Sequence, residues 1–300
     1  MTRSLLPMLP TLSSSFPGSE GWIYEVKYDG YRAILDWDGE TIQITSRNGH
    51  HLNKRFQILH DALSSLFVTY NIIPCCLDGE ICILKNEYCA DFESLHKRKE
   101  KPITFMVFDL LTLEKKLLLS SPLHERKKAL QQVLQGLPDN RSIAMVHMHE
   151  TIDGLWELVQ HYKGEGVVCK KHNSLYREGK RTENWLKIKN WKSATVFLNA
   201  YDHRNGYFHT AVKRSGGIYE IARFSHGLSS EERGALLEII KGNTSKEKQS
   251  LSYVKPGIVL ELEYLDLYNE MLRHPRFKRF CFQKPWEDCT WETIQSSLTI

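Results

Sequence analysis

The sequence lacks the marks of several protein classes. No stretch of its 300 residues approaches the roughly 18 consecutive apolar residues that a membrane span needs. Prolines interrupt the apolar run at the N-terminus, which makes it a poor signal peptide. The seven cysteines are an odd number and contain no C-x-x-C pair, which favours reduced thiols over a disulfide framework or a zinc site. We therefore expect a soluble, cytosolic protein.

The chain also has no internal repeat and no long low-complexity tract. Hydrophobic residues at 41% and charged residues at 25% are values typical of globular proteins, and the length is comfortable for two domains. The positive charge is uneven, because residues 163–192 contain nine Lys or Arg against three Glu while the whole chain is only +4. Such a basic segment is either a solvated surface or a site for nucleotide phosphates or a nucleic-acid backbone.

Alternating apolar residues and turn signals predict a strand-rich first half. Asp38-Gly39, for example, is a typical hairpin turn. Ser121 and Pro122 offer an N-cap and a first-turn proline for a helix. The strands are expected at 22–28, 30–37, 41–46, 75–84, 103–110, 166–171 and 185–189, and the helices at 53–67, 121–134 and 152–162.

The composition changes at about Ser193, which predicts domains at 1–192 and 193–300. Strands are expected at 195–201, 207–213, 218–224 and 258–265. A capping box from Ser229 to Glu232 opens a helix that ends near Ile240, and a polar loop is expected at 241–257. Several short strands around one helix suit a small antiparallel barrel such as an OB-fold.

The sharpest chemical feature is the run Glu25-Val26-Lys27-Tyr28-Asp29-Gly30-Tyr31-Arg32. A lysine between apolar strands is costly to bury, because burial disfavours its charged form. A nucleophilic lysine needs that effect, since only the neutral amine attacks, and neighbouring cations or a metal ion would add to it. We therefore expect a depressed pKa for Lys27. The alternative is a hairpin with an exposed lysine.

Further short motifs follow in a consistent order. Carboxylates in the apolar strand around Glu80 need a partner or a metal. Lys187 and Lys189 alternate with apolar residues and so share one face, where they repel each other unless an anion lies between them. The motifs are S-R-N-G at 46–49, L-D-G-E at 77–80, F-M-V-F-D at 105–109, E-G-V-V at 165–168 and L-K-I-K at 186–189.

In this order the motifs resemble those of the ATP-dependent DNA ligases, within the covalent nucleotidyltransferase superfamily, and are most similar to the ligase module of bacterial DNA ligase D, which serves non-homologous end joining. The resemblance covers about residues 7–285. It implies an α+β fold with two domains. The first is an ATP-grasp-like nucleotidyltransferase (adenylation) domain of antiparallel sheets with flanking helices, and the second is an OB-fold β-barrel.

The resemblance also assigns roles to residues in the nucleotide site. Lys27 matches the lysine that attacks the α-phosphate of ATP and becomes covalently linked to AMP. Glu25 matches the residue near the adenine amino group, and Phe108 matches the ring stacked on adenine. Lys187 and Lys189 match the pair on the α-phosphate, so that Lys27, Lys187 and Lys189 are the expected catalytic residues.

Other matched residues concern the ribose, the metal and DNA. Arg32 and Arg47 match arginines at the ribose and at the phosphates of the nicked strand. Glu80 matches an acid at the ribose hydroxyl or the metal, and Glu165 matches the metal-linked acid for Mg²⁺ or Mn²⁺. The basic segment adds two candidates for DNA contact, and the expected DNA-binding residues are Arg32, Arg47, Lys170 and Lys171.

The resemblance implies that AMP passes from Lys27 to a 5′-phosphate and is then displaced by a 3′-hydroxyl, which seals the strand in DNA repair. We expect a stand-alone monomer in the bacterial cytoplasm, associated with the nucleoid. Its substrate would be double-stranded DNA with nicks or broken ends, and a Ku-like end-binding protein is the expected partner. The basic segment and the barrel would close around the duplex, with strongly salt-dependent binding.

One departure from the family pattern lies near the C-terminus. Such ligases have an R-x-P-x-F stretch followed by an arginine that orients the pyrophosphate, and here Cys281 stands where that arginine is expected. Lys278 or Arg279 could replace it. Two other functions stay open, an RNA ligase or capping-type guanylyltransferase and a non-catalytic nucleic-acid clamp. Preference for ATP or GTP separates the enzymes, and absence of covalent AMP would indicate the clamp.

Overall fold

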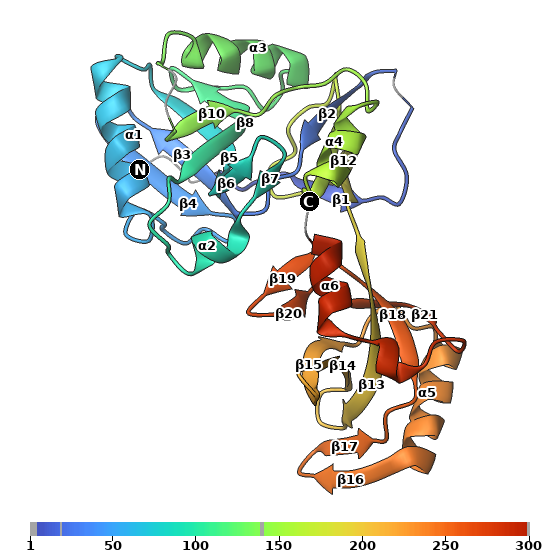
Figure 1. The fold of residues 1–300 in the computed structure, drawn as a ribbon. Helices are drawn as coiled ribbons and strands as arrows, with labels where there is room; N and C mark the ends of the chain where they lie inside the picture. The colour runs from blue at the N-terminus through green and yellow to red at the C-terminus, as the bar shows by residue number, and fades with distance from the viewer. Residues whose placement is uncertain (1–4, 19, 139–140, 299–300) are drawn as a thin grey trace. The chain divides into compact units, whose positions relative to one another are not determined.

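The computed structural model describes residues 5–18, 20–138 and 141–298, and the chain divides into two compact units, Met1–Asn190 and Trp191–Ile300 (Figure 1). Both are built mainly of sheet with a few helices. The division falls two residues before the boundary expected from the sequence. Within the described residues, no helix is both long and apolar enough to cross a membrane.

The first unit contains a six-stranded sheet with the order β10-β8-β5-β3-β4, in which β9 pairs with β8. Its pairs are antiparallel except β10 with β8. Helices α1 (Gln57–Thr69) and α3 (Leu123–Leu134) cover one face (Figure 1). The strands are β3 (Tyr31–Trp37), β4 (Ile42–Ser46), β5 (Cys75–Cys82), β8 (Thr104–Leu113), β9 (Lys116–Leu117) and β10 (Ile143–Met145).

A four-stranded sheet packs on the other face, with the order β1-β12-β11-β2. Only β1 and β12 are parallel. Side chains of β3 alternate between the two cores: Ala33 and Leu35 lie under the helices, while Ile34 lies between the sheets. The strands are β1 (Leu9–Leu12), β2 (Trp22–Val26), β11 (Gly166–Lys171) and β12 (Arg181–Lys189). Smaller elements are β6 (Leu84–Asn86), β7 (Cys89–Ala90), α2 (Phe92–His96) and α4 (Leu155–His161).

The three helices predicted in the first unit begin two to four residues later than expected, at Gln57, Leu123 and Leu155. Helix α3 begins at Leu123, and Pro122 is the N-cap in an extended conformation, without a side-chain cap. The carbonyl group of Ser121 instead accepts a hydrogen bond from the buried Arg126. Proline therefore precedes the first turn here, because a side chain from the helix's own first turn, and not the hydroxyl of Ser121, makes the hydrogen bond at its entry.

The second unit is an OB-like sheet of seven strands. Long strand β13 pairs with β18 through its first half and with β14 and β17 toward its end, and an irregularity near Leu198 interrupts its register with β14. Irregularities of this kind bend strands and help sheets to curve. The elements are β13 (Lys192–Asp202), β14 (Tyr207–Arg214), β15 (Gly217–Phe224), β16 (Thr244–Lys248), β17 (Leu251–Val254), β18 (Val259–Tyr264), β19 (Asp266–Tyr268), β20 (Met271–Arg273), β21 (Arg276–Phe280), a 3₁₀ turn (Trp286–Asp288), α5 (Ser230–Asn243) and α6 (Trp291–Leu298).

Two predictions for the second unit have opposite outcomes. The capping box is confirmed, because the Ser229 side chain accepts from the Glu232 backbone and the Glu232 side chain accepts in return. The loop predicted at 241–257 is wrong, because the hairpin of β16 and β17 occupies most of it. Strand β16 lies at the edge of the sheet and is largely exposed, so its polar residues carry no alternating apolar signal.

Candidate active site

A pocket of about 770 Å³ lies in the first unit, where the two sheets face each other. Its walls come from both sheets and from the turn after β4. Eight residues singled out from the sequence line it, namely Glu25, Lys27, Arg32, Arg47, Glu80, Phe108, Lys170 and Lys187. The fold therefore brings together side chains that are up to 162 positions apart in the chain, between Glu25 and Lys187.

Lys27 follows β2 directly and is anchored by its backbone, whose N–H donates to the carbonyl of Gly166 at 2.9 Å. The adjoining turn needs Gly30, because a Cβ there would lie 2.1 Å from the carbonyl oxygen of Ile81. The ammonium of Lys27 contacts Glu165, with 2.5 Å between Nζ and Oε2. Lys27 thus joins the end of β2 to the start of β11, through its backbone at Gly166 and its side chain at Glu165.

The pKa of Lys27 differs from the sequence prediction. Burial disfavours its charged form, but the attraction of Glu165 and Glu80 outweighs burial and raises the pKa of Lys27. The prediction of a depressed pKa is therefore wrong for this state of the protein. The physical reason is that two carboxylates act on the amine more strongly than the lysines across the pocket. A nucleophilic role requires those carboxylates to be neutralised by another cation.

The two acids have the character of a site for a divalent cation. Burial raises the pKa of Glu80 to about 8, against the opposing effect of Lys27 and Arg32, and the charge of Glu165 raises it further. Burial also raises the pKa of Glu165, although Lys27 opposes this. Two partly buried, mutually repelling carboxylates favour a cation between them. Mg²⁺ commonly binds one or two protein carboxylates plus substrate phosphates, so this donor set fits the expected metal.

Two lysines on β12 add positive charge to the same region. Lys187 pairs in register with Val168 and Lys189 pairs with Gly166 of β11. Burial and the charges of Lys27 and Lys189 lower the pKa of Lys187. This mutual repulsion agrees with the prediction that Lys187 and Lys189 share one face, and it favours an anion such as a phosphate beside them.

Phe108 and Arg32 form the inner wall of the pocket. The guanidinium carbon of Arg32 lies 4.2 Å from the centre of the Phe108 ring. Arg32 also makes a two-pronged ion pair with the buried Asp78, with both N–O distances at 2.6 Å. The hydroxyl of Tyr176 donates to the same carboxylate at 2.7 Å. Arg32 is therefore the partner that a carboxylate in this apolar strand was predicted to need, and the ion pair holds Arg32 against the Phe108 ring.

Glu25 is the centre of a buried charge cluster. Its two carboxylate oxygens contact the ammonium groups of Lys127 and Lys170, the latter at 2.6 Å. All three side chains are only 2% exposed. The Lys170 ammonium also lies 4.2 Å from the ring centre of Phe108 and 4.3 Å from that of Trp185. We refer to Glu25, Lys127 and Lys170 as the Glu25 triad.

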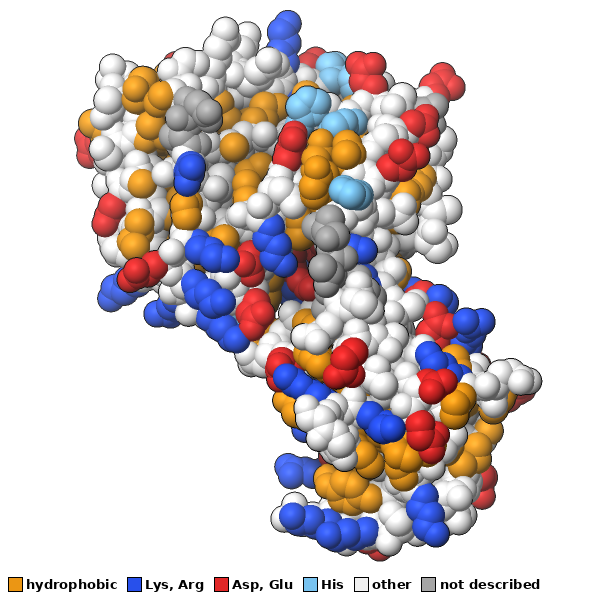
Figure 2. Space-filling model, in the orientation of Figure 1, with side chains coloured by type: hydrophobic (Ala, Val, Ile, Leu, Met, Phe, Trp, Pro, Cys, Tyr) orange, Lys and Arg blue, Asp and Glu red, His pale blue; other side chains and the backbone are white. Residues whose placement is uncertain are grey.

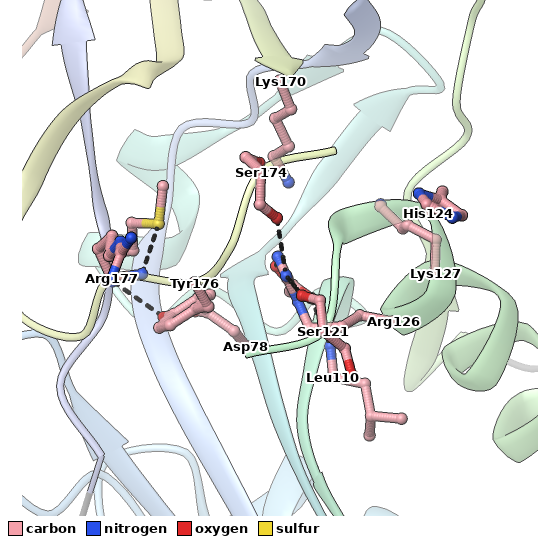
Figure 3. A network of polar contacts seen from close by, with 12 residues as sticks. Asp78, Leu110, Ser121, His124, Arg126, Lys127, Lys170, Ser174, Tyr176 and Arg177 are labelled. Atoms are coloured by element: carbon pink, nitrogen blue, oxygen red, sulfur yellow. Dashed lines mark hydrogen bonds and ion pairs between the residues drawn. The ribbon is translucent and has the colours of Figure 1, made fainter. Parts of the chain in front are cut away.

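A second buried network adjoins the triad (Figure 3). Arg126, which precedes Lys127 on α3, forms a two-pronged ion pair with Asp109 at 2.8 Å. Arg126 also donates to the backbone carbonyls of Ser121 and Ser174. These bonds fasten α3 to β8 and to the segment after β11, so the helix that carries Lys127 is held firmly beside the pocket.

The remaining predicted residues have different surroundings. Arg47 is exposed at the pocket rim, and Lys171 is exposed at the end of β11. Lys170, by contrast, is buried, which disagrees with the prediction that it contacts DNA. Because β11 alternates, Lys170 points into the molecule and Lys171 points to solvent.

Sequence reasoning missed Lys127, Tyr176 and Trp185. A signal for Lys127 exists, since the buried positions of α3 follow the spacing of an amphipathic helix. They are Leu123, Arg126, Lys127, Leu130 and Val133. Two charged residues therefore fall on the apolar face of this helix, which indicates buried partners. No comparable local pattern marks Tyr176.

In the second unit, the stretch that departs from the family pattern lies on and after β21. Lys278 and Arg279 both make ion pairs with Glu261, at 2.9 and 2.6 Å. Cys281 is partly buried, and its backbone N–H donates to Val259. Both candidate substitutes for the missing arginine are thus engaged with one acid within this unit.

Comparison with known proteins gives consistent results. Residues 7–189 match the model of the family described as the ATP dependent DNA ligase domain. The bifunctional non-homologous end joining protein LigD of Bacillus subtilis (strain 168) is 35% identical over 309 residues, which cover 96% of this chain and 51% of that protein. The multifunctional non-homologous end joining protein LigD of Mycolicibacterium smegmatis is 25% identical over 315 residues, covering 95% of this chain and 39% of that protein.

The chain thus spans about half the length, or less, of these two curated relatives. Among solved structures, mycobacterial DNA ligase D complexed with ATP and MES is similar in fold. Its TM-score is 0.59 at 24% identity, and the match covers 95% of this chain and 98% of that one.

Proposed function

Because the chain belongs to the family of ATP-dependent DNA ligases, we propose that it joins 3′-hydroxyl and 5′-phosphate ends of DNA through an AMP carried on Lys27. The observation that carries the proposal is the position of Lys27, whose amine lies at 2.5 Å from Glu165 in a pocket also lined by Glu80 and Lys187. In this proposal the first unit is the adenylation domain and the second is the OB-fold domain.

In the first step, the neutral amine of Lys27 attacks the α-phosphorus of ATP, a P–N bond forms, and pyrophosphate leaves. Lys187 and Lys189 stabilise the negative charge that develops on the phosphoryl oxygens. Glu165 Oε2 is the nearest acceptor for the proton that Lys27 must lose. Phe108 would supply an aromatic wall for adenine, and Arg32, whose guanidinium lies beside that ring, would contact the ribose.

Glu80 and Glu165 would hold Mg²⁺ or Mn²⁺, and a cation bound there would offset the charge of these carboxylates, which raises the pKa of Lys27, as well as the charge of the phosphates. The chain's own contribution is to bring two carboxylates near the lysine, Glu80 on β5 and Glu165 directly before β11.

The later steps use DNA as the substrate. AMP passes to the 5′-phosphate at a break, and the 3′-hydroxyl then attacks that phosphate and releases AMP. The guanidinium of Arg47, exposed at the pocket rim, would contact a phosphate of the broken strand. Lys171 offers a further phosphate contact on the surface of the first unit.

We place this activity in DNA repair of the non-homologous end joining type, on the basis of the relative from Bacillus subtilis. Action as a monomer beside the nucleoid, with a Ku-like end-binding protein as partner, stays a prediction.

Covalent labelling tests the proposal. The protein is first treated with pyrophosphate to remove bound AMP and then incubated with α-labelled ATP and Mg²⁺ or Mn²⁺. We expect label on the denatured 34.9 kDa chain. Lys27→Ala should abolish it, because no other side chain holds that position. Lys116→Ala, which changes an exposed lysine outside the pocket, should label like the wild type.

Two outcomes would contradict the proposal. Stronger labelling from GTP would indicate a guanylyltransferase. Complete lack of label with both nucleotides would indicate a nucleic-acid clamp, and would point to Cys281 as a change that disables the first step. Sealing of a nicked duplex by the labelled protein then tests the DNA steps directly.

A further inference from the structure

The Glu25 triad joins three elements that are distant in sequence. Glu25 lies on β2, Lys170 on the neighbouring β11, and Lys127 on α3, 102 positions from Glu25. The Oε1 atom of Glu25 contacts the ammonium of Lys127, and its Oε2 atom contacts the ammonium of Lys170. Glu25 and Lys170 line the pocket, whereas Lys127 does not and reaches it only through the carboxylate.

The charge of the triad is not balanced. A single lysine would compensate the buried carboxylate, so the second ammonium leaves an excess positive charge in the interior, which is unfavourable for folding. The cost is visible at Lys170, where burial and the charge of Lys127 lower the pKa to about 8 although Glu25 opposes this. An arrangement that disfavours folding at a pocket wall is typical of a functional site.

Two lysines restrict the carboxylate more than one does. An ionised carboxylate offers about four acceptor positions, and the two ammonium groups leave about two of them for another donor. Contacts on both oxygens fix the rotation of the group as well as its location. Because Glu25 faces the pocket, the remaining positions are available to a donor on a bound ligand.

We propose that Lys127 is a positioning residue of the nucleotide site, which holds the carboxylate of Glu25 so that it accepts a hydrogen bond from the 6-amino group of adenine. This inference rests on the proposed function, since it takes ATP as the ligand. Lys127 itself contacts no ligand atom, and its effect passes through Glu25 alone.

A ligand lacking the 6-amino group provides the test. Purine riboside 5′-triphosphate differs from ATP only in that group. Binding of both nucleotides is measured by calorimetry in a Lys27→Ala background, which removes the covalent step. Lys127→Met should weaken ATP binding about tenfold, the scale of one impaired hydrogen bond to a charged group. It should leave the binding of purine riboside triphosphate unchanged.

Matched variants separate positioning from folding. Lys127→Met leaves the balanced pair of Glu25 and Lys170, so the fold should be retained, and thermal unfolding checks this. Lys128→Met changes the exposed neighbour on the same helix and should bind both nucleotides like the parent. Lys127→Gln keeps an N–H donor and should recover part of the ATP affinity.

Three results would overturn the inference: equal weakening for both nucleotides, no weakening for either, or no ATP binding by the parent. Equal weakening would mean that Lys127 only supports the pocket structure. Failure of the proposed function has a different signature, which is the absence of lysine-linked AMP on the wild-type protein while the binding measurements are unaffected.

Discussion

Charged side chains in and beside the pocket form ion pairs that join different strands and helices. Asp78 pairs with Arg32 and accepts a hydrogen bond from Tyr176. Asp109 pairs with Arg126, and Glu25 pairs with two lysines. The first two groups are balanced, and only the Glu25 triad carries an excess charge. Within these three groups, Lys170 is the residue whose pKa is lowered into the range near neutral pH.

The pKa of Lys170, about 8 in the folded protein, lies below its value in the unfolded chain. The unfolded state consequently binds more protons between these two values, and the free energy of unfolding must rise with pH there. Lys170→Met removes this contribution. Between pH 7 and 9 the wild type should gain about 1 kcal/mol relative to Lys170→Met, measured by urea unfolding.

Lys171→Met is the control for this measurement, because the adjacent side chain is exposed. It should show the same pH dependence as the wild type. Parallel curves for the wild type and Lys170→Met would mean that the ammonium of Lys170 is not held in the buried pair with Glu25.

The sequence contains part of this residue-level information. The order of motifs carries a resemblance that implies one nucleotide site for Lys27, Glu80 and Phe108, and these three residues do line one pocket. It was insufficient for the pKa of Lys27, which depends on how near Glu165 comes across the sheet. It was also insufficient for Tyr176, since a tyrosine in a connecting segment carries no periodic signal.

At the scale of elements, close approach of backbone segments shapes the active site. The turn after β2 runs against β5 so closely that a Cβ on Gly30 would meet the Ile81 carbonyl oxygen at 2.1 Å, its carbonyl carbon at 3.0 Å and the Cys82 sulfur at 3.2 Å. Backbone atoms of a central strand cannot move aside cheaply. The glycine of the lysine motif is therefore required by packing, independently of any role in chemistry.

Gly30→Ala should accordingly destabilise the protein by about 2 kcal/mol, within the usual range for overpacking, and displace the turn that presents Lys27. Denaturant unfolding measures the first effect and the rate of covalent labelling with ATP measures the second. Gly18→Ala is the matched control, since no atom lies within 4 Å of the added Cβ and φ is not in the left-handed region. Equal stability of the two variants would contradict the close approach.

Elements without an apolar stripe were the ones that sequence analysis missed. The hairpin of β16 and β17 was predicted as a loop because only the inner strand, with Ser252 and Val254 buried, alternates. The inner strand β17 is fixed in the sheet by its pairing with the end of β13, which joins residues about 50 positions apart in the sequence. Strands on the strongly alternating or wholly apolar runs were found, since burial on one or two faces leaves its own pattern.

At the scale of the whole molecule, surface charge bears on the proposed contact with DNA. Figure 2 shows Lys and Arg side chains gathered along the edge of the first unit that carries α2 and β4, and again over the hairpin of β16 and β17. The basic residues of segment 163–192 fall into two groups by burial. Lys170 is buried at the pocket wall, whereas Lys171, Lys180 and Arg181 are exposed. The net charge of the segment therefore overstates the positive charge that it exposes at the surface.

Salt dependence of binding distinguishes the two groups. Each phosphate contact adds about 0.9 to the slope of log affinity against log salt concentration, because binding releases a counterion. Lys171→Met should therefore lower the slope for a nicked duplex by about 0.9, provided that Lys171 contacts a phosphate as proposed. Lys170→Met should leave the slope unchanged, since a buried ammonium displaces no counterion from DNA. Fluorescence anisotropy over a range of salt concentrations measures both. A slope reduced by Lys170→Met but not by Lys171→Met would reverse the assignment and require the Glu25 triad to open when DNA binds.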